Sequence, residues 1–483
     1  MTKADPTATP DQARLELAPE AMRAFGHAVV DAIVDRLADQ ASLKVTTRKT
    51  RAELDALLWQ DPPAGPTDPN AVLARVVEHV LGNCMIPSHP RFFAFVPGPS
   101  SFVGAMADAL VAGFNPFAGT WFESSGAAEV ELLTIDWLRR AFGLPEGAGG
   151  LFVSGGSVAN LTALAAARHM KLADRVAGAV GYGSALVHGS LDKAFHILGF
   201  GREQFRRLPV GDDGRLVPGT VAEAVAADRA RGLRPFLIIA NAGTTNTGAV
   251  DPLPALADLA AAGGLWLHVD GAYGAAVALT ARGAAALDGL GRADSVVVDP
   301  HKWLFQPYEI GAVLVRQRDW LKRTFQSEAD YMQDTEPLNR EINFCDHGIQ
   351  LTRGFRALKL WMTVQVHGMD AIRAAIEHGL GLAEHAEQLL RADRRFEVMT
   401  PASLGVVTFR YVGQGKGAGN LDALNRAIVG AMIEDGFALA TSTQVRGATV
   451  LRFCTVNPRT SEGDMAAVIE HIAMLGARIA DKS

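Results

Sequence analysis

Residues 295–305 read SVVVDPHKWLF, and this stretch decides the fold class. Its first four residues form a short apolar run of the kind that makes a buried strand of a parallel sheet. A histidine and a lysine, His301 and Lys302, follow directly after the strand. Ligands of parallel α/β sheets bind outside the carboxyl ends of the strands, so Lys302 lies at a position suited to chemistry.

Similar apolar runs occur on both sides of this stretch. They alternate with helical segments at 157–170 and 221–231, which is typical of a mostly parallel sheet covered by helices on both faces. The expected strands are 151–153, 185–187, 236–240, 265–269, 295–298 and 312–315. We therefore predict a large α/β domain over residues 86–355.

The flanking regions have a different texture. Residues 1 to about 17 read as a loose polar tail, and a helix is predicted from Pro19 to about Leu37. Its apolar stripe must be buried against the rest of the chain or a second subunit. We assign 1–85 to a tail and a helical dimerisation arm with a proline-rich connector at 60–69. Residues 356–483 are predicted to form a small α+β domain. Its expected elements are a long helix over 356–391, strands near 406–412, 438–442 and 449–456, and a last helix from 461.

Composition excludes several classes of protein. The 483 residues carry a net charge of -6, which argues against a general nucleic-acid binder. Cys84, Cys345 and Cys454 are too far apart for a disulfide framework or a zinc site of the usual spacing, so we expect no metal and a reducing compartment. The chain has neither a secretory signal nor an apolar run long enough to span a membrane, and a cytoplasmic location is predicted.

Five of the expected strands end in groups that could bind or react with a ligand. Parallel strands deliver their carboxyl ends to one edge of the sheet, so these groups should meet. In chain order they are the turn Ser154–Ser157 (SGGS), His188, the pair Thr244 and Thr245, Asp270 with the following Ala272, and His301 with Lys302.

Each feature also has a plain structural interpretation when it stands alone. An SGGS turn before a helix is often only a helix cap. A single histidine or aspartate at a strand end is often structural, and a single lysine is usually a solvated surface residue. Only their convergence on one edge favours a binding site.

Pyridoxal 5'-phosphate is a cofactor that uses this set of groups. It needs a lysine amine for a Schiff base and a carboxylate to keep its pyridine nitrogen protonated. Its phosphate suits a glycine-rich helix N-terminus, where backbone N–H groups and the helix dipole meet the anion. Asp270 and Lys302 lie one helix-sized segment apart, and a right-handed crossover brings both to the same edge.

Beyond these spacings, the motifs DPHKW, HVDGAY, GTT, SGGSVANLTAL and HPRFFAF resemble the pyridoxal-phosphate-dependent group II amino-acid decarboxylases. This family includes the aromatic-L-amino-acid, glutamate and histidine decarboxylases. The resemblance runs from the N-terminal arm to Leu451-Arg452-Phe453. It implies a fold-type I enzyme, a homodimer with active sites near the subunit interface, and a small-molecule L-amino acid as substrate.

The resemblance assigns roles around the cofactor ring. Lys302 would carry the cofactor, and Asp270 would hold the pyridine nitrogen as a cation. His188 would stack on one face of the ring, and Ala272 would press on the other. With Tyr331, the residues expected to take part in catalysis are Lys302, His188 and Asp270.

The resemblance also assigns the cofactor's polar contacts. Gly156 and Ser157 would bind the phosphate, Thr245 would hydrogen-bond the cofactor, and His301 would lie near the phosphate or the substrate carboxylate. The family often has asparagine where this chain has Asp299. Because a carboxylate repels phosphate unless it turns away or bonds to backbone N–H groups, Asp299 is not expected to be a phosphate ligand.

The bond that breaks depends on how the site orients the substrate, which the sequence does not encode in any simple pattern. The family protonates its product carbon with a tyrosine on a loop after the lysine, and Tyr331 has that spacing. Relatives with phenylalanine there tend to be aldehyde synthases, so Tyr331 favours decarboxylation to the amine. Tyr331 could also simply pack.

The substrate pocket is expected from two apolar stretches. The first contributes Phe95 and Pro97, and the second contributes Phe117 and Trp121, reaching in the family from the other subunit. Arg452 resembles an arginine that holds the substrate's α-carboxylate. Apolar walls favour an aromatic side chain, because a second carboxylate would be left unpaired.

Some positions leave the substrate open. Gly98 would leave room for a ring as large as indole, whereas Arg91, Arg353 and Arg446 could serve an acidic substrate. We therefore predict decarboxylation of an L-amino acid, expected to be aromatic, to the amine and CO2. The alternatives are an acidic or diamino acid decarboxylase, an aromatic aldehyde synthase, and, in a different class, a non-catalytic binding scaffold.

Overall fold

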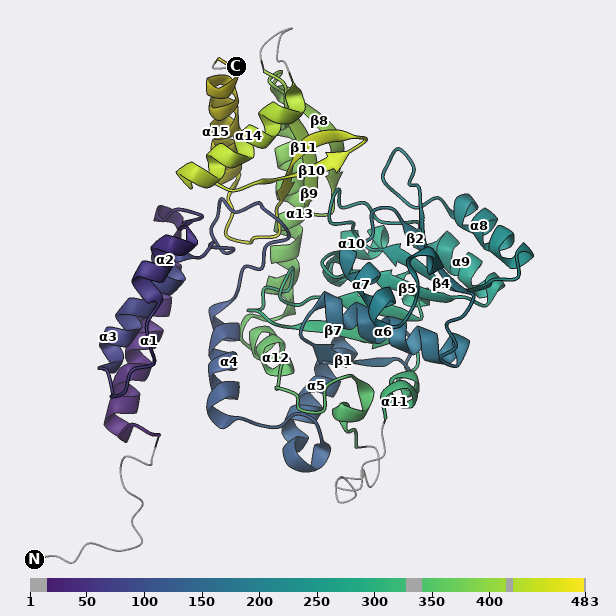
Figure 1. The fold of residues 1–483 in the computed structure, drawn as a ribbon, viewed down its shortest axis with the longest axis horizontal. Coiled ribbons are helices and arrows are strands. Elements are labelled where there is room, and N and C mark those ends of the chain that lie inside the picture. Colours follow the sequence, from purple (N-terminus) through teal and green to yellow (C-terminus); the bar gives the residue numbers. More distant parts are fainter. Residues whose placement is uncertain (1–14, 327–340, 414–419, 482–483) are drawn as a thin grey trace, which may run out of the picture. The chain divides into compact units, whose positions relative to one another are not determined.

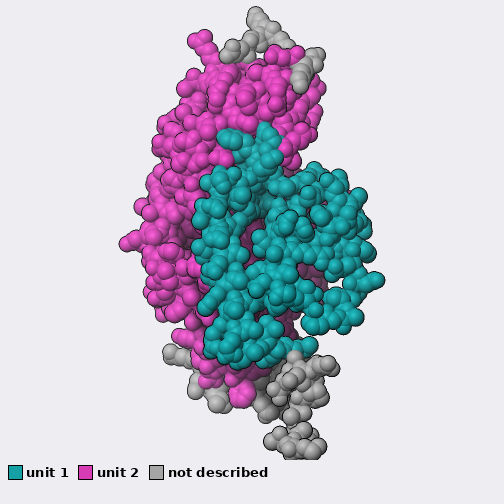
Figure 2. Space-filling view, turned by 90° about the vertical axis from the view of Figure 1, so that its left-hand side faces the viewer, with its two compact units in different colours: residues 1–86, 435–437 teal, residues 87–434, 438–483 magenta. Residues whose placement is uncertain are grey.

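The chain forms two compact units, coloured separately in Figure 2. The computed structural model describes residues 15–326, 341–413 and 420–481. The first unit comprises residues 1–86 with 435–437, and the second comprises 87–434 with 438–483.

The first unit is helical. Its helices are α1 (Pro19–Asp39), α2 (Arg51–Leu58) and α3 (Pro69–Arg75). Proline at the start of α1 and α3 suits the first helical turn, and Thr50 begins α2 with a capping box to Glu53. The predicted N-terminal helix is confirmed. No residue of α1 is buried, so its apolar stripe remains partly exposed in the single chain.

The second unit is built on a seven-stranded sheet, visible in Figure 1, in the order β1-β7-β6-β5-β4-β2-β3. The strands are β1 (Gly149–Val153), β2 (Ala179–Ser184), β3 (Phe205–Leu208), β4 (Arg234–Asn241), β5 (Trp266–Asp270), β6 (Ser295–Val298) and β7 (Gly311–Val315). Only β7 runs antiparallel to its neighbours. The predicted α/β class with a mostly parallel sheet is confirmed.

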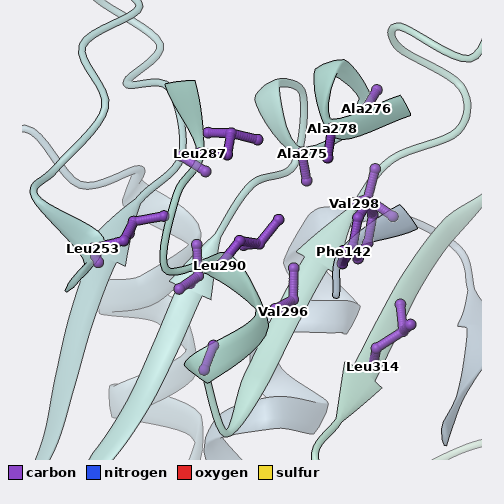
Figure 3. Packing of buried hydrophobic residues seen from close by; sticks show 14 of the residues in the cluster. Phe142, Leu253, Ala275, Ala276, Ala278, Leu287, Leu290, Val296, Val298 and Leu314 are labelled. Atoms are coloured by element: carbon purple, nitrogen blue, oxygen red, sulfur yellow. The ribbon is translucent and has the colours of Figure 1, made fainter. Parts of the chain in front are cut away.

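Helices cover both faces of this sheet because alternate strand residues enter two separate apolar clusters. In β4, for example, Ile238 faces one cluster and Ile239 the other. The helices α5 (Trp121–Ala141), α8 (Pro218–Ala230) and α9 (Leu253–Gly263) pack on the first face; Figure 3 shows Leu253 of α9 near strand residues of this cluster. The helices α6 (Gly156–Leu172), α7 (Gly189–Ile197) and α11 (Asp319–Phe325) pack on the second.

One predicted strand of this sheet needs correction, and one strand was missed. Residues 185–187 form a turn, and the strand lies earlier, at β2. Gly181 and Gly183 obscured it in the sequence, yet a side chain at Gly181 would lie 2.7 Å from the ring of Phe195. The strand β3 was not predicted, because it is a four-residue edge strand with two arginines, and charge is common at sheet edges.

The C-terminal part contains a second, antiparallel sheet in the order β10-β11-β9-β8. Its strands are β8 (Phe396–Ser403), β9 (Val406–Tyr411), β10 (Thr441–Val445) and β11 (Ala448–Cys454). The predicted helix over 356–391 is two helices, α12 (Ala357–His367) and α13 (Met369–Ala392), since Gly368 has φ 78° between them. The strand β8 was also missed.

The other helices of the second unit are α4 (Phe102–Phe114), α10 (Ala281–Ala286), α14 (Leu421–Asp435) and α15 (Glu462–Ala480). The last begins after Ser461, which forms a capping box with Asp464. Within the described ranges, no helix combines the length and apolar character that crossing a membrane requires.

Candidate active site

A cavity of about 530 Å³ opens at the carboxyl ends of the parallel strands. It gathers groups from segments that are far apart in the chain. Of the residues that the sequence singles out, nine line it: Phe95, Gly156, Ser157, His188, Thr245, Asp270, Ala272, His301 and Lys302. The predicted convergence of these side chains on one edge is therefore present in the structure.

The glycine-rich turn forms one wall of the cavity. The turn leads from β1 into α6, whose N-cap residue, Gly155, offers no side-chain cap. The N–H groups of the first helical turn have no partner within a helix and attract an anion together with the helix dipole. A side chain at Gly156 would meet Asp299 Oδ2 at 2.8 Å. Glycine therefore keeps this anion-binding turn open.

A hydrogen-bond chain behind the cavity orients Asp270. One oxygen, Oδ1, accepts the N–H of Ala272 at 3.1 Å, and Oδ2 accepts Nδ2 of Asn160 at 3.1 Å. The Asn160 oxygen in turn lies 2.9 Å from Nε2 of His268. Burial lowers the pKa of His268 to about 4, so this imidazole is neutral. Its other nitrogen, Nδ1, lies 2.8 Å from the hydroxyl of Ser295.

The directions of these bonds are fixed by the donor at the far end. Trp266 Nε1 can only donate, so Ser295 Oγ accepts from it at 2.8 Å and gives its own proton to His268 Nδ1. His268 must then donate through Nε2 to Asn160, which leaves the amide of Asn160 to donate to Asp270. Asp270 is thus held as a hydrogen-bond acceptor that faces the cavity.

The same asparagine reaches His188. Asn160 Nδ2 donates to Ser190 Oγ at 3.0 Å, and that hydroxyl lies 2.8 Å from His188 Nδ1. The N–H of Ser190 also donates to His188 Nδ1 at 3.2 Å, so Nδ1 carries no proton. Asn160 therefore holds both the carboxylate of Asp270 and the ring of His188 in place.

The amine of Lys302 lies 2.9 Å from Asp299 Oδ2. Burial lowers the pKa of Lys302, whereas the Asp299 carboxylate raises it, and the balance leaves that pKa above its ordinary value. The lysine is therefore held as an ammonium ion. An amine attacks a carbonyl only when it is neutral, so reaction at Lys302 requires this ion pair to be relieved.

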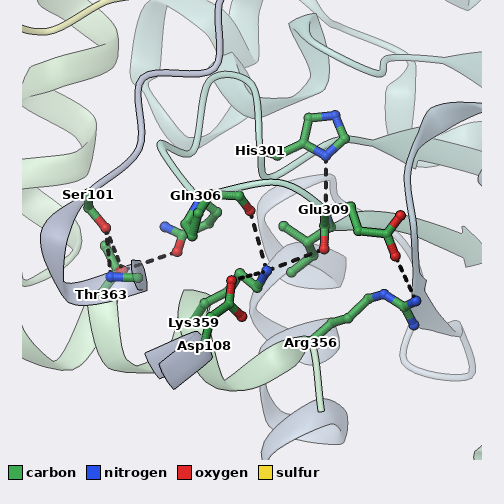
Figure 4. Close-up of polar contacts among 11 residues, drawn as sticks. Ser101, Asp108, His301, Gln306, Glu309, Arg356, Lys359 and Thr363 are labelled. Carbon is green, nitrogen blue, oxygen red and sulfur yellow. Dashed lines mark hydrogen bonds and ion pairs between the residues drawn. The ribbon is translucent and has the colours of Figure 1, made fainter. Parts of the chain in front are cut away.

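The ring of His301 is fixed from behind by the loop that follows it. Its Nδ1 accepts the N–H of Ile310 at 3.2 Å, and Nε2 lies 3.6 Å from Asp299 Oδ2. Burial lowers the pKa of His301. Figure 4 shows Lys359 beneath this loop, where its amine donates to Asp108 at 2.8 Å and to the carbonyls of residues 307 and 309 at 3.3 Å each. The loop position, and with it the His301 ring, depends on this buried amine.

Four of the predicted substrate residues do not line the cavity of this chain. Pro97 is buried, Phe117 lies in the segment before α5, and Trp121 is the first residue of α5; none of the three is among the lining residues. Arg452 lies behind Phe95 and donates to its carbonyl, while its Nε and Nη2 find no acceptor among the described residues. Tyr331, which was predicted to take part in catalysis, lies outside the described residues.

Three arginines could have bound an acidic substrate, but each contacts a protein group and none lines the cavity. Arg353 is buried in an ion pair with Glu131, with 2.6 Å between Nη2 and Oε1. Arg446 donates to the carbonyl of Asp212, and Arg91 lies 3.9 Å from Asp464. Gly98 packs on the backbone of His301, so it makes room for the protein itself and not for a substrate ring.

Sequence reasoning missed several residues of the site. The lining residues to which it gave no role are Val96, Val158, Asn160, Ser190, Asn241, Gly243 and Tyr273. Ser154 and Gly155 of the predicted turn also line the cavity, as does Asp299, which was not expected to be a phosphate ligand. Asn160 had a usable signal, because it is an amide on the sheet-facing side of a helix that is otherwise rich in alanine and leucine. Of the two threonines after β4, Thr244 is buried and bonds to Thr247, which leaves Thr245 to face the cavity.

The cavity fits pyridoxal phosphate. An open helix N-terminus, the Asp270 carboxylate, the His188 imidazole and the Lys302 amine surround a space large enough for the cofactor. These groups match its phosphate, its pyridine nitrogen, its ring face and its aldehyde.

Known proteins match the chain along nearly its whole length. The family model for the pyridoxal-dependent decarboxylase conserved domain matches residues 55–412. An aromatic-L-amino-acid decarboxylase of Bacillus atrophaeus is 42% identical over 467 residues, covering 96% of this chain and 97% of that protein. A phenylacetaldehyde synthase of Arabidopsis thaliana is 31% identical over 461 residues, covering 92% of this chain and 93% of that protein.

The fold matches as well. The structure of Oryza sativa TDC with PLP and tryptamine superposes with a TM-score of 0.91 at 29% identity, covering 97% of this chain and all of that one. These matches confirm three predictions: the family that the sequence motifs resemble, the fold class and the cofactor. The chain belongs to the pyridoxal-dependent decarboxylase family and is a pyridoxal 5'-phosphate-dependent amino-acid decarboxylase.

Proposed function

We propose that this enzyme converts an aromatic L-amino acid into the corresponding amine and CO2. The observation that carries the proposal is the meeting of Lys302, Asp270 and His188 around one cavity that also has an open anion-binding turn. The 42% identity to the aromatic-L-amino-acid decarboxylase of Bacillus atrophaeus supports an aromatic substrate.

Each lining group has a distinct task in this proposal. Lys302 holds the cofactor covalently, Asp270 bonds its pyridine nitrogen, and Gly156 and Ser157 hold its phosphate. When bound, pyridoxal phosphate supplies an electron sink for the electron pair that departing CO2 leaves behind. Asp270 would sustain that sink, because Asn160 and Ala272 donate hydrogen bonds to its two oxygens and orient the carboxylate toward the position of the pyridine nitrogen.

The remaining groups orient the ring and the substrate. His188 and Ala272 flank the ring, Thr245 hydrogen-bonds the cofactor, and His301 lies near the lysine. Arg452 binds the substrate's α-carboxylate in this proposal, for which its nitrogens Nε and Nη2, unpaired among the described residues, are suited.

The cavity favours an uncharged substrate side chain. Phe95 and Val96 line it, and among the described residues no arginine does. A second carboxylate would lose its hydration without gaining a partner, which costs more than burying an aromatic ring gains. Phe117 and Trp121 complete the pocket of the second subunit in this proposal, with Pro97 supporting the wall beside Phe95.

A homodimer would account for the exposed apolar surface of the first unit. Several of its apolar side chains are exposed: Val34, Trp59, Val72, Val77, Val80 and Leu81. Leaving this much apolar surface in water is unfavourable, and a second copy would bury it.

The proposal also includes the division of the chain into three domains, at 1–85, 86–355 and 356–483. The last boundary is supported by the two separate sheets, one before residue 356 and one after it. A cytoplasmic location belongs to the same proposal.

A panel of L-amino acids, assayed for CO2 and product with added cofactor, tests the proposed substrate. It should contain Trp, Tyr, Dopa, Phe, Glu, Asp and 2,4-diaminobutyrate. Amine from one aromatic member is the expected result. Turnover of Glu, Asp or 2,4-diaminobutyrate alone would overturn the pocket argument, and no turnover with no bound cofactor would point to a binding scaffold.

The product depends on Tyr331 in this proposal. Tyr331→Phe removes the hydroxyl that would deliver a proton to the product carbon, so we expect CO2 release to continue. Dissolved O2 would then oxidise that carbon and be reduced to hydrogen peroxide, and hydrolysis would release aldehyde and ammonia in place of part of the amine. Chromatography of the products, with ammonia and hydrogen peroxide assays, measures the shift. Unchanged amine output would remove Tyr331 from the mechanism. It would also mean that this position does not distinguish decarboxylases from aldehyde synthases.

A further inference from the structure

Asp299 presents a carboxylate to the turn that we propose as the phosphate site. Asp299 is only 2% exposed, and its Oδ2 lies 2.9 Å from the amine of Lys302. The same oxygen lies so close to Gly156 that a side chain there would contact it at 2.8 Å. A phosphate bound at the first turn of α6 would therefore lie close to the Asp299 carboxylate and be repelled by it.

The Lys302 ammonium offsets only the charge of Asp299 itself, and the described backbone around the carboxylate adds no hydrogen-bond donor for the phosphate's charge. Oδ1 of Asp299 is buried and has no hydrogen-bond partner among the described residues. Oδ1 also lies beside the turn, because a side chain at Gly311 would lie 2.5 Å from Gly155 Cα and 2.7 Å from Oδ1. The carboxylate is thus neither turned away from the anion-binding turn nor neutralised by backbone N–H groups.

Few charges face Asp299 from the elements around it. From its own turn come Lys302 and His301, and from the following loop comes Tyr308, whose pKa Asp299 helps to raise. Asp270, at the end of β5, acts on the same lysine. The first turn of α6 carries no charged side chain. The Lys302 ammonium is accordingly the cation that balances Asp299 before the cofactor arrives.

We propose that Asp299 binds the cofactor's phosphate as a neutral carboxylic acid, so that each cofactor molecule brings one proton from solvent into the site. This inference rests on the proposed cofactor site. Two neighbouring anions that share a site cannot both keep their full charge, and one proton resolves the repulsion. The proton bonds to Oδ1, the oxygen without a partner, and no covalent bond breaks. The resulting O–H donates to a phosphate oxygen.

Proton uptake makes cofactor affinity depend on pH. A phosphate monoester is a dianion above about pH 6, so its own titration is complete at higher pH. Uptake of one proton with each cofactor molecule then weakens cofactor binding about tenfold for each unit by which the pH rises. Asn at position 299 can donate a hydrogen bond without a proton, so D299N should lose this slope and bind more tightly at high pH.

Calorimetry counts the proton directly. We would titrate the full-length protein, freed of cofactor, with pyridoxine 5'-phosphate at about pH 8 in HEPES and in Tris. This probe lacks the aldehyde and cannot react with Lys302, and the two buffers differ in ionisation enthalpy. We expect the wild type to take up about one proton more than D299N. Asp258→Asn, which removes an exposed carboxylate on α9, serves as the matched control and should behave as wild type.

The outcomes separate this inference from the proposed function. Binding by the wild type with no proton uptake would overturn the inference, even if D299N fails to fold. Equal uptake by the wild type and D299N would assign the proton to another group and overturn it as well. If neither the probe nor pyridoxal phosphate binds, and pyridoxal phosphate gives no protein-bound absorbance, the proposed cofactor site itself is wrong.

Discussion

Lys302→Ala is expected to abolish the visible absorbance of the protein-bound cofactor and to reduce decarboxylation by roughly a thousandfold or more. The lysine lies in the cavity with its amine 2.9 Å from Asp299, and among the described residues it is the lysine that lines the cavity. Without this amine the cofactor is held only by non-covalent contacts. Absorbance spectra of the purified protein after dialysis measure the loss.

Two control variants separate the amine from its charge. Lys302→Arg keeps a cation beside Asp299 but cannot form a Schiff base, so it should also lack the absorbance while preserving more stability than alanine. Lys193→Ala changes an exposed lysine on α7 and should leave the spectrum intact. A persistent cofactor band in Lys302→Ala would show that another lysine carries the cofactor.

Arg353→Met is expected to destabilise the second unit by about 3–5 kcal/mol, because it leaves the buried Glu131 without its partner. Both side chains are 1% exposed. The guanidinium also donates to the carbonyls of Ala118 at 2.9 Å and Phe152 at 2.8 Å. Its loss would therefore strand one charge and two carbonyl groups. The midpoint and slope of urea unfolding, followed by fluorescence, measure the change.

The matched control is an exposed arginine with acidic partners. Arg282→Met removes contacts with Glu377 and Glu384 but leaves them in water, so its effect should stay within about 1 kcal/mol. Adding Glu131→Leu to Arg353→Met should recover part of the loss, since it removes the stranded charge. Equal effects of Arg353→Met and Arg282→Met would contradict the structural role assigned to the buried pair.

This buried pair also shows why the substrate could not be read from composition. In the sequence, Arg353 was one of three arginines that could have served an acidic substrate. Its partner Glu131 lies 222 residues away along the chain. No local pattern links the two, so only the folded chain shows that this arginine supports the protein interior.

The sequence by itself determined the fold class and most of the reactive groups. An apolar run that stops at a polar residue is a local signal, and in parallel sheets it places that residue at the ligand-binding edge. This was enough to identify Lys302, Asp270, His188 and the glycine-rich turn. It failed at β2, where two glycines interrupted the run.

Tertiary structure decided everything that depends on a partner distant in sequence. Asn160 orients Asp270 from 110 residues away, and the choice of Thr245 over Thr244 follows from which hydroxyl the fold buries. The orientation of Asp299 is of the same kind. The sequence allowed a carboxylate turned away from the phosphate, but packing against Gly156 and Gly311 directs it into the site. Side-chain direction and hydrogen-bond pairing are set by neighbours in space, and those neighbours exist only once the chain has folded.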